Sequence, residues 1–143
     1  MREMTRSAQI ARSPESVYRL VEEVEHYPEF VPGCTSAQVL ERGEREMLAR
    51  LAVRRGPLRM QFTTRNRLDP GRAVHMHLVE GPFRTLEGRW SFTPIADQGC
   101  RIELALRFQF SNGLMSALFD SLFEETAASL VRAFVARAQA MPA

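Results

Sequence analysis

The segment from Cys100 to Phe110 alternates between apolar and polar side chains, and this alternation constrains the fold more than any other feature of the chain. Successive side chains of a β-strand point to opposite faces, so the pattern predicts a strand with one face against a core and the other in water. A sheet with one apolar face has to be covered by another element. The apolar positions are Cys100, Ile102, Leu104, Leu106, Phe108 and Phe110.

Four further runs have the same period of two, and turn sequences separate them. We place turns at Arg55-Gly56-Pro57, Asp69-Pro70-Gly71 and Asp97-Gln98-Gly99. Together with a short first strand, these runs predict one curled antiparallel sheet of six or seven strands. Their inward positions are Met47, Ala49, Leu51 and Val53, then Leu58, Met60, Phe62 and Thr64, then Val74, Met76 and Leu78, and finally Leu86, Gly88, Trp90 and Phe92.

Helical spacing occurs at two places. Ser13 and Pro14 are a capping residue and a first-turn proline, and they predict a helix that ends at about Val24. Two prolines then limit residues 27–33 to a turn or a single helical turn. A second, much longer helix is predicted from Leu114 to about Met141. Its apolar stripe is Leu118, Leu122, Phe123, Thr126, Ala127, Leu130, Phe134 and Ala138.

These elements predict an α+β fold in which residues 1–143 form one domain, and the long last helix lies across the concave side of a curved antiparallel sheet. A strongly curved sheet and a straight helix cannot touch along their whole lengths. The gap is either an apolar pocket or a dry core filled by large side chains, and the pattern leaves both interpretations open.

Composition excludes several classes of function. All 19 basic residues are arginine, so a phosphate-binding loop with its lysine, a Schiff-base lysine and a pyridoxal enzyme are excluded. Cys34 and Cys100 lie far apart and only three histidines are present, so we expect no metal site and no redox pair. No run reaches the roughly 20 apolar residues of a membrane span. We expect a soluble protein of a reducing compartment, and its net charge of +2 does not by itself indicate nucleic acid.

Blocks at 27–34, 62–66, 78–94 and 108–138 carry a resemblance that covers nearly the whole chain. The sequence resembles the coenzyme-Q-binding START-like family of the polyketide cyclase/dehydrase superfamily, whose fold is a helix grip. With Gly33 before Cys34, the sequence resembles the bacterial branch of this family that is labelled RatA, the ribosome association toxin. The resemblance implies a single START-like lipid-binding domain that binds ubiquinone and supports respiration or quinone biosynthesis. For the bacterial branch it also implies a block on the association of ribosomal subunits.

We predict a ligand cavity lined by inward apolar residues. Trp90 is expected against a quinone ring, Thr64 or Asn66 within hydrogen-bond reach of a quinone carbonyl, and Phe83 as a lid over the cavity mouth. For each of these residues a purely structural role is the alternative. The complete predicted set is Tyr27, Phe30, Val31, Phe62, Thr64, Asn66, Met76, Leu78, Phe83, Trp90, Phe108, Phe110, Leu118, Leu122 and Phe123.

The chain also offers two candidate contact surfaces. The apolar start of the last helix, from Leu114 and Met115 to Leu118 and Phe119, is a candidate docking edge on a membrane. Arginines without intervening acids occupy residues 50–67, and both lipid and RNA phosphates would attract them. The predicted membrane or RNA surface is Arg54, Arg55, Arg59, Arg65 and Arg67, whereas His75 and His77 share an outward face and are expected to be solvated.

Three functions remain open from the sequence. The first is a non-catalytic carrier of a hydrophobic ligand, with ubiquinone as bound ligand and no cofactor, working in the cytoplasm or at the inner face of the membrane. The second is a protein that binds the large ribosomal subunit and blocks subunit association, with no role for DNA. The third, an aromatase or cyclase, needs an acid or base inside the cavity, and the inward positions offer none, so we expect no enzyme.

Overall fold

The computed structural model describes residues 1–96 and 99–141. It contains one seven-stranded antiparallel sheet in the order β1-β7-β6-β5-β4-β3-β2. The α+β helix-grip fold predicted from the sequence is confirmed. In chain order the elements are β1 (Arg2–Ile10), α1 (Pro14–Glu22), the 3-10 helix η1 (Val24–Glu29), β2 (Cys34–Arg42), β3 (Glu46–Arg55), β4 (Leu58–Asp69), β5 (Ala73–Glu80), β6 (Phe83–Ile95), β7 (Gly99–Phe110) and α2 (Gly113–Ala140).

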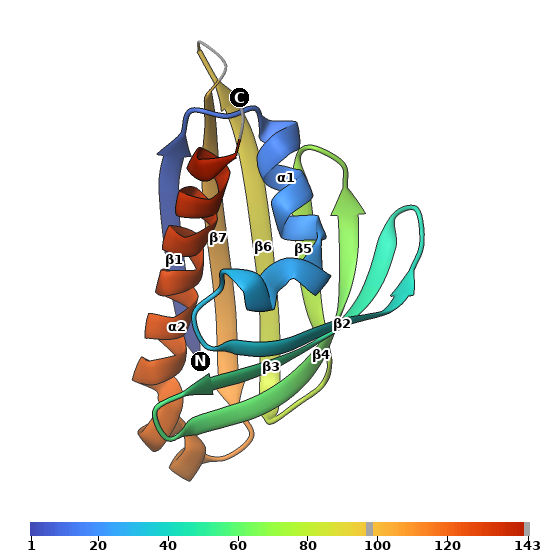
Figure 1. The fold of residues 1–143 in the computed structure, drawn as a ribbon. Coiled ribbons are helices and arrows are strands. Elements are labelled where there is room, and N and C mark those ends of the chain that lie inside the picture. Colours follow the sequence, from blue (N-terminus) through green and yellow to red (C-terminus); the bar gives the residue numbers. More distant parts are fainter. Residues whose placement is uncertain (97–98, 142–143) are drawn as a thin grey trace.

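The sheet curls around α2, and the two shorter helices lie on the same face. Figure 1 shows α2 beside β1 and β7, α1 over the upper part of β6, and η1 above the curled strands β2–β4. Because the sheet is curved, the hairpin between β3 and β4 points toward α2 (Figure 1). All six even positions of residues 100–110 are buried, as the alternation predicts.

The helix boundaries follow local chemistry. Ser13 caps α1 by accepting a hydrogen bond from the Ser16 amide at 3.2 Å, and Asn112 caps α2 through the Met115 amide at 2.9 Å. α1 ends at Glu22, two residues before the predicted end, and Val24 instead begins η1. The turn or single helical turn predicted at residues 27–33 is found in part: η1 with its internal Pro28 begins earlier, at Val24, ends at Glu29, and a turn follows it up to Gly33.

β1 and β2 differ most from the sequence prediction. β1 has nine residues rather than a short strand, and β2 has no apolar alternation because most of it is an exposed edge. Gly33 fixes the entry into β2: its φ is +83°, its carbonyl accepts a hydrogen bond from the Arg54 amide at 2.7 Å, and a Cβ there would lie 3.0 Å from the Arg54 carbonyl oxygen. The predicted turns at residues 55–57 and 69–71 join strands. The turn at Asp97-Gln98-Gly99 lies largely outside the described residues.

Aromatic side chains form two clusters on the concave side of the sheet. In the first, Phe134 meets Trp90 edge-on at 5.2 Å, Tyr27 at 5.3 Å and Phe30 at 5.1 Å between ring centroids. In the second, Phe83 stacks on Phe110 at 4.7 Å and lies 5.2 Å from Phe123 and 6.0 Å from Phe62. Edge-to-face and offset pairs of this kind hold rings in fixed positions. The two clusters therefore pack separately, and members of both face the space between them.

Candidate ligand cavity

A cavity of about 100 Å³ lies between the sheet, α2 and the segment that joins η1 to β2. Its lining is predominantly apolar, and Tyr27 and Trp90 come from the first aromatic cluster, whereas Phe62 and Phe123 come from the second. The sheet side consists of Leu51, Val53, Phe62, Thr64, Met76, Leu86, Gly88, Trp90, Leu104 and Leu106. The other side consists of Phe123, Thr126, Ala127 and Leu130 of α2, Tyr27 of η1, Val31 and Pro32 of the following loop, and Cys34 at the start of β2.

The few polar groups of the cavity are already hydrogen-bonded within the protein. The Thr64 hydroxyl donates to Asn66 Oδ1 at 2.7 Å, and the Thr126 hydroxyl donates to the Leu122 carbonyl at 2.8 Å. The Tyr27 hydroxyl donates to the Val21 carbonyl. Burial raises the pKa of the Tyr27 phenol and of the Cys34 thiol, so both are neutral at pH 7. The described lining thus contains no carboxylate, imidazole or amine, and it favours an uncharged, apolar group.

The size of the cavity limits what enters it without movement. An engineered apolar cavity of about 150 Å³ binds benzene, whereas ordinary ligand pockets measure about 300–1,000 Å³. A space of about 100 Å³ is smaller than the cavity that holds benzene. A substituted ring or an isoprenoid tail therefore enters only if the lining moves, and the segment around Pro32 is the part of the lining that is neither strand nor helix.

Seven of the predicted ligand-binding residues line the cavity, namely Tyr27, Val31, Phe62, Thr64, Met76, Trp90 and Phe123. The remaining predicted residues lie elsewhere. Phe83 is not a lid, because it is buried and stacked on Phe110, and Phe108 and Phe110 are fully buried in the same cluster. Phe30 packs on Phe134 instead. Asn66 is buried as the partner of Thr64.

Three further predicted ligand-binding residues, on the sheet and on α2, do not line the cavity. Leu78 and Leu122 are partly buried against the core but do not reach the cavity. Leu118 is 58% exposed and Leu114 is 71% exposed, so the apolar stripe of α2 is not covered in its first turns. Met115 and Phe119, the other members of the predicted docking edge, are partly buried.

Sequence reasoning missed the aliphatic and small members of the lining. Leu86, Gly88, Leu104 and Leu106 are predicted on the inward face and Ala127 on the apolar stripe, but the predicted ligand-binding set omits all five. Aromatic rings fill space in clusters, so the positions that leave space are those between them. A Cβ at Gly88 would lie 2.5 Å from Met76 Cε, so the side chain of Met76, its partner on the neighbouring strand β5, lies over Gly88.

The predicted arginine surface divides between two faces of the molecule. Arg54, Arg59, Arg65 and Arg67 are exposed on the convex face, as strand alternation requires. Arg55 instead points inward, and its guanidinium donates to Ser129 Oγ on α2 at 3.0 Å. His75 and His77 lie on the convex face.

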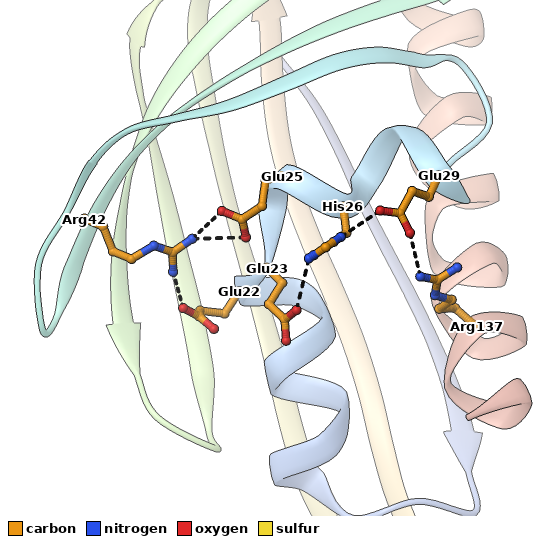
Figure 2. Close-up of polar contacts among 7 residues, drawn as sticks. All are labelled: Glu22, Glu23, Glu25, His26, Glu29, Arg42 and Arg137. Atoms are coloured by element: carbon orange, nitrogen blue, oxygen red, sulfur yellow. Dashed lines mark hydrogen bonds and ion pairs between the residues drawn. The ribbon is translucent and has the colours of Figure 1, made fainter. Parts of the chain in front are cut away.

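Two groups of ion pairs hold η1 against its neighbours (Figure 2). Arg42 of β2 pairs with Glu22 and, at 2.9 Å, with Glu25. Glu29 bridges His26 at 2.7 Å and Arg137 of α2 at 2.9 Å, and Arg137 also lies over the Phe30 ring. The hydrogen bond to Glu29 raises the pKa of His26, and the same bond together with Arg137 lowers the pKa of Glu29. These pairs connect η1, whose Tyr27 lines the cavity, to β2 on one side and to α2 on the other.

The described residues contain neither a membrane-spanning helix nor a cluster of metal ligands. None of the helices in this part of the chain has the length and apolar character needed to cross a membrane. Within residues 1–96 and 99–141, no three histidine, cysteine, aspartate or glutamate side chains converge as metal ligands would.

The seven-stranded sheet wrapped around α2 defines the helix-grip class of fold, and comparison with known proteins shows the family. The chain belongs to the family described as polyketide cyclase / dehydrase and lipid transport, whose sequence profile matches residues 10–135. It is 42% identical over 139 residues to the ribosome association toxin RatA of Vibrio cholerae, covering 97% of this chain and 96% of that protein.

More distant similarities extend the comparison. The chain is 28% identical over 136 residues to the mitochondrial coenzyme Q-binding protein COQ10 homolog B of Xenopus laevis, covering 92% of this chain and 56% of that one. The 18 kDa protein CC1736 from Caulobacter crescentus has a TM-score of 0.79 at 30% identity, covering 97% of both chains. The Zhui aromatase/cyclase from Streptomyces has a TM-score of 0.86 at 18% identity, covering 96% of this chain and 93% of that chain, and this similarity shows the fold alone.

Proposed function

We propose that this chain is a non-catalytic carrier that binds a hydrophobic ligand, with ubiquinone as the first candidate, in the cavity between the sheet and α2. The observation that carries the proposal is the cavity itself, which is apolar, lies between two fixed aromatic clusters and has no described ionisable group that is charged at pH 7. The family's description as lipid transport and the name of the Xenopus relative support the choice of ligand class.

In this proposal the quinone ring occupies the cavity beside Trp90 and the tail leaves past Pro32. Each buried methylene contributes about 0.8 kcal/mol, so a few isoprene carbons against the core suffice for micromolar binding. Because the cavity is smaller than a substituted ring, the lining around Pro32 moves to admit the ring, and the tail lies largely outside. Delivery to membrane enzymes would then occur at the cytoplasmic face of the membrane, where Leu114 and Leu118 offer exposed apolar contacts.

Titration with a short-chain ubiquinone tests the proposal, because Trp90 is the only tryptophan and lines the cavity. We expect saturable quenching of its fluorescence in the wild type and none in Ala127→Met, whose longer side chain would occupy the space. Ala117→Met, an exposed position on the same helix, is the matched control and retains quenching. Equal quenching in all three proteins would show that the quinone does not enter the cavity.

A second function rests on a different observation, the 42% identity to proteins named ribosome association toxin. In this alternative the chain binds the large ribosomal subunit in the cytoplasm and the exposed arginines of the convex face contact RNA phosphates. Sucrose-gradient profiles of ribosomes with added protein test it. A shift from joined to separate subunits that is lost in the variant with Arg59, Arg65 and Arg67 changed to glutamine supports it, and an unchanged profile excludes it.

A further inference from the structure

A depression in the surface adjoins the cavity where β3 meets α2. It is open to solvent, has a volume of about 600 Å³ and shares Pro32 with the cavity. Three arginines line it: Arg55 from the end of β3, and Arg132 and Arg137 from α2. We call this place the arginine mouth.

Arg55 is the partly buried charge of the arginine mouth whose partner in the structure is a neutral hydroxyl. It lies two residues beyond Val53, a cavity residue, and its partly buried guanidinium donates to the Ser129 hydroxyl at 3.0 Å. The Ser129 hydroxyl in turn donates to the Thr126 carbonyl at 2.8 Å. A guanidinium carries five N–H donors, and a neutral hydroxyl satisfies one of them without balancing the charge. A partly buried charge of this kind is stabilised when an anion replaces the neutral partner.

The other two arginines add to the excess of positive charge. Within residues 1–96 and 99–141, no carboxylate forms an ion pair with Arg55 or with the exposed Arg132. Arg137 pairs with Glu29, but Glu29 is shared with His26, as Figure 2 shows. One shared carboxylate therefore faces three guanidinium groups, directly beside an apolar cavity.

We infer that the arginine mouth binds the anionic head of the ligand whose apolar body lies in the cavity, so that the preferred ligand class is an amphiphile with a carboxylate or phosphate group. Arg55 exchanges its neutral partner Ser129 for this head, and Arg132 makes a second contact. Guanidinium groups pair with carboxylate and phosphate through two parallel hydrogen bonds, which gives strength and orientation together. The inference rests on the proposed function for the body of the ligand, but it places an acidic amphiphile ahead of neutral ubiquinone.

The test compares three probes with the same ten-carbon chain: decanoate, decyl phosphate and decan-1-ol, each below the concentration at which it forms micelles. Trp90 fluorescence reports binding at pH 7.5. We expect at least one of the two anions to bind roughly tenfold more tightly than the alcohol, which is the scale of one charge-assisted hydrogen bond. The anion that binds better tells a carboxylate head from a phosphate head.

Variants then assign the effect to residues. Arg55→Gln and Arg132→Gln are each expected to remove most of the anion's advantage while decanol binding stays unchanged. Arg132 is exposed, so its variant tests the inference even where Arg55→Gln folds poorly. Arg84→Gln, an exposed arginine of β6 outside the arginine mouth, is the control and changes nothing.

Each alternative result overturns a definite part of the inference. Equal affinity for decanol and both anions refutes the anion site and leaves the apolar carrier standing. Anion binding that persists in Ala127→Met refutes the amphiphile, because the body would then lie outside the cavity. Failure of all three probes to bind counts against the inference and the proposed carrier function alike.

Discussion

Filling the cavity from α2 is the most informative perturbation of this protein. Ala127 is buried, lies on the face of α2 toward the sheet and lines the cavity. Methionine is a good helix former with a flexible side chain that fits irregular gaps. Ala127→Met therefore extends apolar atoms into the space without disturbing the helix.

The structure gives the size of the expected effect. Empty core volume costs about 24 cal/mol per Å³, so a cavity of about 100 Å³ costs about 2.4 kcal/mol. Partial filling recovers about 1–2 kcal/mol of this, which at about 2–4 °C per kcal/mol raises Tm by roughly 2–8 °C. The same substitution at Ala138, which is fully buried on α2 but not beside the cavity, overpacks the core and costs about 1–3 kcal/mol.

Urea unfolding and calorimetry of the two variants, measured without ligand, give the comparison. We expect opposite signs: Ala127→Met above the wild type in stability and Ala138→Met below it. A loss of stability in Ala127→Met equal to that in Ala138→Met would refute the reasoning, because it would mean that the space beside Ala127 is already filled in solution.

Three further outcomes follow from the packing and the ion pairs. Phe134→Ala, which removes the fully buried centre of the first aromatic cluster, should lower the free energy of unfolding by about 3–5 kcal/mol in urea titrations. Gly33→Ala should cost about 1–2 kcal/mol, because its backbone is left-handed, and an unchanged urea midpoint would contradict this. NMR titration should give His26 a pKa above the ordinary histidine value and His75 one below it, with Glu29→Gln lowering only that of His26. Since the folded-state pKa of His26 is raised, the stabilising contribution of His26 is present at low pH and is lost as the pH rises through that pKa. The difference in stability between the wild type and Glu29→Gln should therefore be smaller in alkali than at low pH.

Strand alternation predicted most of the sheet, because a strand with one buried face must place apolar residues at every second position. The same rule could not find β2, whose residues are mostly exposed at the edge of the sheet. The alternation in β3 also predicted an inward position for Arg55, which the sequence analysis did not use. Met47, Ala49, Leu51 and Val53 face inward, and the next residue in this series is Arg55, which the structure indeed turns toward α2.

The candidate site was harder to predict than the fold for a physical reason. Sequence shows which residues face the core, but a cavity depends on how those residues pack against each other. Phe83 and Phe110 satisfy one another by stacking, so they fill volume rather than border a space. Periodicity likewise placed Leu118 on the apolar stripe, but it is not evidence that the sheet reaches that turn of α2.

Mass spectrometry of the protein purified from its own cells tests the central claim most directly. Released under denaturing conditions, the wild-type chain should yield one apolar or amphiphilic small molecule in near-stoichiometric amount, and Ala127→Met, purified in parallel, should yield almost none. Recovery of no such molecule from the wild type, or of equal amounts from both proteins, would contradict the account of a ligand held between the sheet and α2.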